Sequence, residues 1–151
     1  MYGEVVGVVN SKYVYDYAES LGFAITINEA RDVIDDLISK GYVSGRAVLG
    51  ISYNPINEYT ASFRGMTAGL LVAEINQDMA VAKSGLIVGD TITEIDGEYV
   101  FDDDGNTTTI SEILAGKKPG DTITVTVARA DSLGRVRKMD IEVELSEYRG
   151  N

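Results

Sequence analysis

The chain is a succession of short apolar runs rich in valine, isoleucine and threonine, and glycines or Asp-Gly pairs interrupt them at frequent intervals. Runs of this length and composition are typical of strands that bury at least one face. In the last two runs apolar residues alternate with polar ones, so one face of those strands is expected to meet solvent. We predict seven strands, at residues 4–10, 21–27, 48–53, 69–75, 91–95, 122–128 and 139–145.

Three other segments have the apolar spacing or the capping residues of short helices. In the first, Asn28 is the expected N-cap and Gly41 the expected end. In the last, Thr109 and Glu112 have the spacing of a capping box. The helices are predicted at residues 28–40, 78–83 and 110–114, and two polar segments, 13–20 and 55–67, are predicted to be connections. Together these elements indicate an α+β, β-rich fold.

The pair Ser44 and Gly45 is the best candidate for a domain boundary. Two strands and one helix are predicted before it, which is too little for an independent core. The chain of 151 residues as a whole is long enough to bury a core without metals or disulfides. We therefore expect residues 1–44 to be part of a larger domain and residues 45–151 to form a second domain.

The composition excludes several classes of function. With 24 acidic and 13 basic residues the net charge is −11, which disfavours nucleic acids and anionic membrane surfaces as partners. Cysteine and histidine are both absent, so thiol catalysis, thiolate or imidazole metal sites and a Ser-His-Asp triad within this chain are excluded. No export signal and no apolar run of roughly 18 residues is present, so we expect a soluble chain without a signal or transmembrane segment.

The acidic clusters predict neither a metal site nor a catalytic site. Fitting residues 102–106 to an EF-hand loop would put Val100 and Ser111 at the first and last ligand positions, where calcium needs strong oxygen donors. Glu142 and Glu144 alternate with apolar residues and are expected on the wet face of a strand. We therefore predict no catalytic residue, no metal and no cofactor.

The segment around Gly50 suggests a backbone binding site. A glycine between the apolar residues Leu49 and Ile51, at the start of a strand, lets successive backbone N–H groups converge on a carboxylate. The strand that follows can accept a further strand along a free edge, and the helix at 110–114 can form the opposite wall. A purely structural turn explains the same glycine, and core packing explains the same apolar residues.

The order of the motifs in the second domain resembles that of bacterial PDZ domains. The segment RAVLGI resembles the carboxylate-binding loop, and three further segments resemble the central signature, which ends in an Asp-Gly turn. These segments are residues 46–51, 69–75, 80–86, 89–97 and, before a late strand, 119–122. The resemblance covers residues 45–147 and implies a PDZ-like, partly open β-barrel or sandwich with two helices.

The first 44 residues resemble the end of the protease domain in the HtrA/DegP family of trypsin-like serine proteases. The matching runs are YGEVVGVVN and LGFAITIN, followed by a helix. The resemblance implies two strands and a helix left from a trypsin-like β-barrel, without the nucleophile motif and the preceding His and Asp. The chain alone should therefore be inactive, whereas the parent resembles a serine endopeptidase that is exported or membrane-anchored and is a homo-oligomer, a trimer by resemblance.

In such a parent the PDZ module would capture hydrophobic C-termini of unfolded or regulatory proteins and thereby localise or activate proteolysis. An alternative function is a scaffold domain that makes oligomer contacts and takes no free peptide ligand. Separately, a strand-swapped dimer is an assembly that the open strands of this fragment would allow. The resemblance assigns peptide binding to Arg46, Leu49, Gly50, Ile51, Ser52, Tyr53, Ile110, Ile113 and Leu114.

Overall fold

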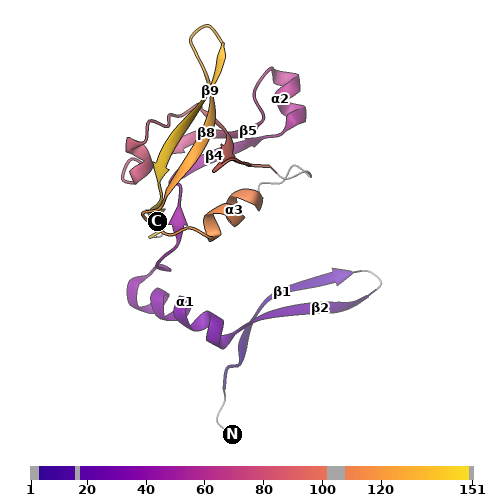
Figure 1. Cartoon of the computed structure of the whole chain (residues 1–151). Helices are drawn as coiled ribbons and strands as arrows, with labels where there is room; N and C mark the ends of the chain where they lie inside the picture. The colour runs from indigo at the N-terminus through magenta and orange to yellow at the C-terminus, as the bar shows by residue number, and fades with distance from the viewer. Residues whose placement is uncertain (1–3, 16–17, 102–107, 150–151) are drawn as a thin grey trace. The chain divides into compact units, whose positions relative to one another are not determined.

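A computed structural model of the chain describes residues 4–15, 18–101 and 108–149 (Figure 1). The chain divides into two compact units. The first comprises the residues up to Ser44 together with Arg149, and the second spans Gly45–Tyr148. Each unit is described by itself. The assignment of the first unit to a protease domain stays a prediction.

The first unit is a β-hairpin followed by a helix. Strands β1 (Gly7–Tyr15) and β2 (Ala18–Thr26) pair antiparallel, so the connection predicted at 13–20 is wrong: both strands extend into it. Helix α1 (Ile27–Lys40) begins one residue earlier than predicted and its N-cap is Thr26 in place of Asn28, because the Thr26 hydroxyl accepts the Glu29 N–H in a capping box. It ends, as predicted, at Gly41, whose φ is +81°.

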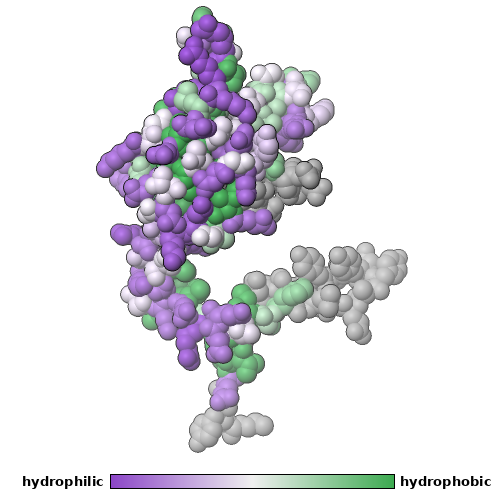
Figure 2. All heavy atoms as spheres, in the orientation of Figure 1, coloured by the Kyte–Doolittle hydropathy of each residue, from purple (hydrophilic) through white to green (hydrophobic). Residues whose placement is uncertain are grey.

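Apolar side chains of this unit are largely exposed. None of the residues of α1, all of which the structure describes, is buried, and Leu37 and Ile38 are 49% and 80% exposed. In β1, Val9 is 75% exposed. In Figure 2 apolar residues of this unit stand at the surface between hydrophilic ones. A hairpin and one helix do not bury their own apolar surface, as the sequence predicted.

The second unit is built on one main antiparallel sheet. Its strands lie in the order β4-β5-β6-β8-β9, with β7 paired to β6, and a small second sheet joins β3 to β10. The strands are β3 (Ala47–Val48), β4 (Ile51–Ile56), β5 (Gly69–Ile75), β6 (Thr91–Ile95), β7 (Glu98–Tyr99), β8 (Thr122–Ala130), β9 (Val136–Glu144) and β10 (Ser146–Glu147). This order makes β4 an edge strand, and in the described part of the chain nothing pairs with its outer side.

Three short helical segments accompany the sheet: α2 (Glu58–Arg64), the 3₁₀ turn η1 (Ala80–Lys83) and α3 (Thr108–Ala115). Helix α2 corrects the connection predicted at 55–67. The side chain of Asn57 caps it by accepting the Thr60 N–H at 2.9 Å. Strand β4 also runs through Pro55 to Ile56, since an edge strand tolerates the missing N–H of proline.

The core of the second unit lies between the inward faces of these strands, η1 and the loops. Its fully buried side chains include Leu70, Val72, Val81, Ile92, Ile95, Val100, Ile123, Val125, Val127, Val143 and Leu145. The β-rich α+β prediction is confirmed. The sheets remain open and do not close into a barrel.

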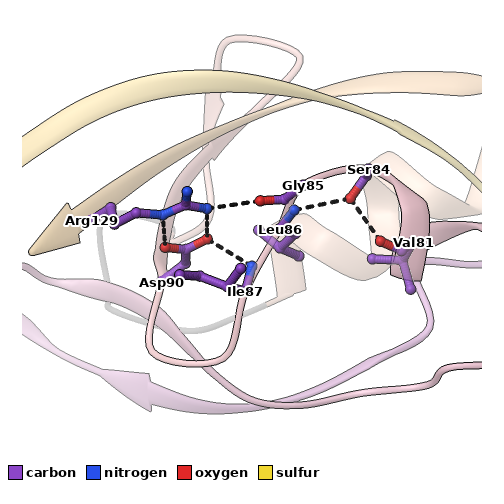
Figure 3. Close-up of polar contacts among 7 residues, drawn as sticks. All are labelled: Val81, Ser84, Gly85, Leu86, Ile87, Asp90 and Arg129. Atoms are coloured by element: carbon purple, nitrogen blue, oxygen red, sulfur yellow. Dashed lines mark hydrogen bonds and ion pairs between the residues drawn. The ribbon is translucent and has the colours of Figure 1, made fainter.

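An ion pair inside this unit holds the loop after η1. Asp90 is completely buried, and both of its carboxylate oxygens accept hydrogen bonds from the Arg129 guanidinium, at 2.6 Å each (Figure 3). One of these oxygens also accepts the Ile87 N–H at 3.0 Å, and Arg129 donates to the Gly85 carbonyl at 2.9 Å. Strand β8 is thereby tied to the segment that connects η1 to β6.

Candidate functional site

Gly50 separates the two strands β3 and β4 and adopts a backbone conformation that favours glycine. Its φ is +76°. A Cβ built on Gly50 would lie 2.7 Å from the Met79 Sδ and 3.2 Å from a methyl of Val81. A glycine is therefore needed at this position for two reasons: its positive φ, and the close approach of Met79 and Val81, which leaves no space for a side chain. A side chain at this position would therefore be crowded against Met79.

The backbone next to Gly50 directs a donor away from the sheet. The Gly50 carbonyl accepts the Asn76 N–H at 2.9 Å, so it points toward the end of β5. Every peptide bond in the described residues is trans, and in a trans peptide the carbonyl and the following N–H point in opposite directions. The Ile51 N–H therefore points away from β5, toward the open edge of β4.

The apolar residues predicted for the pocket lie in or against one core. Leu49 is 6% exposed and belongs to the core cluster. Ile51, Ile113 and Leu114 are half-buried and pack against that cluster. Helix α3 lies beside β3, the strand that leads into Leu49 (Figure 1). The side chain of Ile110 lies outside the described residues.

The remaining predicted residues face solvent. The side chains of Ser52 and Tyr53 on β4 are exposed, as is that of Arg46 just before β3. The Arg46 carbonyl accepts the Tyr148 N–H at 2.9 Å, which fixes the backbone at this point beside β10. Arg46, the Gly50 loop and the edge strand β4 follow one another along the chain.

Two features that support the loop were not predicted. The first is the packing of Met79 and Val81 beneath Gly50, and the second is the hydrogen bond from the Ala80 N–H to the Ser146 Oγ at 3.0 Å, which ties η1 to β10. Both depend on contacts between segments distant in sequence. The sequence carries no local signal for them.

A hollow lies on the polar face of β6, β8 and β9, lined by none of the residues of the Gly50 loop. Its lining includes Glu94, Asp96, Thr126 and Asp140. The hydrogen bond from Lys117 lowers the pKa of Asp96 below its usual value, and the same contact raises the pKa of Lys117. Within the described residues no group of three or more acidic side chains is arranged to hold a metal ion.

Comparison with known proteins identifies the second unit. Residues 47–145 match the family described as PDZ domain. The chain belongs to the PDZ domain family. This match covers the Gly50 loop, the edge strand and α3, and it confirms the resemblance read from the sequence.

Curated relatives of this PDZ-containing chain are HtrA- and DegP-like proteases. It is 32% identical over 130 residues to a probable periplasmic serine endoprotease DegP-like from Halomonas elongata, covering 84% of this chain and 26% of the relative. It is 28% identical over 138 residues to a serine protease Do-like HtrA from Lactobacillus helveticus, covering 84% and 32%. The chain thus spans about a quarter to a third of the length of these relatives.

Solved structures of proteases are also similar to this chain, over nearly its whole length. The HtrA-type protease AlgW with decapeptide is 26% identical with a TM-score of 0.62, covering 99% of this chain and 44% of that one. A serine endoprotease from Yersinia pestis is 25% identical with a TM-score of 0.55, covering 97% and 44%. Among the described helices, none has the length and apolar character needed to cross a membrane.

Proposed function

We propose that the PDZ domain of this chain binds the C-terminal segment of another protein as an added strand on the open edge of β4. The observation that carries the proposal is the direction of the Ile51 N–H, which the Gly50 carbonyl and its bond to Asn76 turn toward that edge. Strand addition of this kind gains affinity from main-chain hydrogen bonds and specificity from alternate side-chain positions.

The residues divide into three roles. The backbone N–H groups of Leu49, Gly50 and Ile51 hold the terminal carboxylate, and the exposed Arg46 adds a favourable charge. Ile51, Ser52 and Tyr53 pair with the incoming strand. The terminal side chain of the ligand lies among the apolar residues, which are Leu49, Ile51, Ile110, Ile113 and Leu114.

In the parent protein this binding serves an HtrA-like serine endopeptidase. Capture of exposed hydrophobic C-termini, from unfolded or regulatory proteins, localises or activates cleavage by the protease domain. The similarity to DegP-like relatives described as periplasmic supports a parent outside the cytoplasm, and the AlgW structure with a decapeptide supports a peptide ligand. The first unit is then the end of the protease domain.

Backbone amide NMR of the chain tests the binding mode. Titration with a peptide that ends in a free apolar residue should shift the amide signals of Leu49, Gly50 and Ile51 most strongly, with smaller shifts along Ser52 and Tyr53. Amides on β9, at the opposite end of the sheet, serve as the internal control. Shifts confined to β8 and β9, or to the first unit, would contradict binding at the Gly50 loop, and the absence of any shift would favour the scaffold alternative, in which the domain makes subunit contacts and takes no peptide.

A further inference from the structure

The outer face of β4 carries a carboxylate beside the proposed ligand strand. Ser52 on β4 is paired with Glu74 on β5, and both residues are exposed. The Ser52 Oγ donates to a Glu74 carboxylate oxygen at 3.4 Å. The preceding pair, Ile51 with Ile75, is half-buried against the core. Because side chains alternate along a strand, Ser52 and Glu74 lie on the face opposite to the apolar pair.

A ligand strand on the open edge continues this alternation. When the terminal carboxylate is held at the Gly50 loop, the terminal side chain faces the core together with Ile51. The penultimate side chain then faces outward, on the same side as Ser52 and Glu74. Neighbouring strands lie about 4.8 Å apart, so Glu74 is two strands, about 10 Å, from the ligand backbone. Only long side chains meet across that distance.

The residue between the ligand strand and Glu74 is Ser52, which has a small side chain. Ser52 leaves the path from the ligand to Glu74 open, whereas a large side chain at this position would block it. In the described part of the chain Glu74 takes part in no ion pair, and its hydrogen-bond partner there is the neutral Ser52 hydroxyl. Its negative charge is therefore free to interact with a basic ligand side chain, and lysine and arginine have the necessary length.

We propose that Glu74 selects ligands with lysine or arginine at the penultimate position. This inference rests on the proposed function of the same site, since it assumes a ligand strand on β4 with its carboxylate at the Gly50 loop. An exposed ion pair contributes modestly and is screened by salt. We expect a lysine peptide to bind about two- to fivefold more tightly than its glutamine counterpart at low ionic strength.

The test is calorimetry with three acetylated pentapeptides that end in Lys-Val, Gln-Val and Glu-Val with free carboxylates. Wild-type chain should bind them in that order of decreasing affinity. Salt at about 0.5 M should reduce the differences in affinity between the peptides, because it screens interactions between exposed charges. In Glu74→Gln the lysine and glutamine peptides should bind equally. Glu144→Gln is the matched control, because it removes the same charge from an exposed position on β9, at the other end of the sheet, and should retain the preference.

The outcomes separate this inference from the function on which it rests. Equal binding of the three peptides to wild type, with the acid form of the glutamine peptide still preferred over its amide, would overturn the role of Glu74 and leave carboxylate capture intact. A lysine preference that survives Glu74→Gln would likewise overturn it. A preference that Glu144→Gln also abolishes would overturn it too, since the net charge of the chain, and not the position of Glu74, would then be responsible. If no acid peptide binds better than its amide, both proposals fail together.

Discussion

Gly50 and Met79 are in such close contact that the space for a side chain on Gly50 is already filled by the thioether of Met79. A Cβ at Gly50 would lie 2.7 Å from Sδ and 3.1 Å from Cβ of Met79. The loop that bears the proposed carboxylate site therefore rests directly on the residue before η1. Its conformation depends on contacts within the domain as well as on the freedom of glycine.

Gly50→Ala should destabilise the PDZ domain more than an alanine at another glycine of similar φ. Gly134, in the β8–β9 hairpin, has φ +74° and no atom within 4 Å of an added Cβ, so Gly134→Ala costs only the backbone strain, about 1–2 kcal/mol. Gly50→Ala adds overpacking of about 1–3 kcal/mol. Denaturant unfolding followed by circular dichroism compares the two. Equal losses in the free energy of unfolding would show that Met79 yields without cost.

Arg129→Met should destabilise the domain strongly, because it leaves the carboxylate of Asp90 buried without its charged partner. Removal of one member of a buried pair costs about 3–5 kcal/mol. Lys138→Met is the matched control: its ion pair with Glu94 is 3.3 Å long and Lys138 is 57% exposed, so the cost should stay below about 1 kcal/mol. Thermal or urea unfolding measures both. A loss for Arg129→Met as small as that of the control contradicts a structural role for this pair.

The carboxyl of Asp36 should titrate far below the usual range of aspartates. Its hydrogen bond with the Lys40 ammonium, with further hydrogen bonds from Ser44, lowers the pKa of Asp36 from 3.8 to about 2. Because the folded pKa is depressed, the stabilisation is complete above about pH 4 and is lost as the pH falls through about 2.

Carbon-13 NMR of the Asp36 carboxyl group follows this titration directly. Lys40→Met should raise the pKa of Asp36 toward the usual value by removing the largest cause of the shift. A wild-type midpoint near 3.8, or one that Lys40→Met leaves in place, would show that these contacts do not hold the end of α1 to Ser44 in solution.

Much of the PDZ fold could be predicted from the chain because its strands carry their own signals. The predicted strands 69–75 and 91–95 coincide with β5 and β6, since glycines and β-branched residues mark both their bounds and their burial. Helix α2 could not be found in this way. Its aromatic residues Tyr59 and Phe63 are 82% and 84% exposed and only Ala61 is buried, so the apolar spacing that predicts a helix facing the core is missing.

The candidate site likewise has a part that could be predicted from the sequence and a part that could not. The Gly50 loop has a local signal, an apolar residue on each side of a glycine at the start of a strand. The support of Gly50 by Met79 and the position of Glu74 beside Ser52 depend instead on packing and strand register between segments more than twenty residues apart in sequence. Such register is set by which strand faces are buried together in the folded domain, and the local pattern of one strand does not show that pairing.

The dependence of binding on a free carboxylate tests the central claim most directly. Calorimetry with one peptide that ends in an apolar residue, in its acid and amidated forms, compares ligands that differ only at that group. Hydrogen bonds to a charged group contribute about 1.5–3 kcal/mol each, so the acid should bind at least tenfold more tightly than the amide. Equal affinity of the two forms would contradict carboxylate capture at Leu49, Gly50 and Ile51.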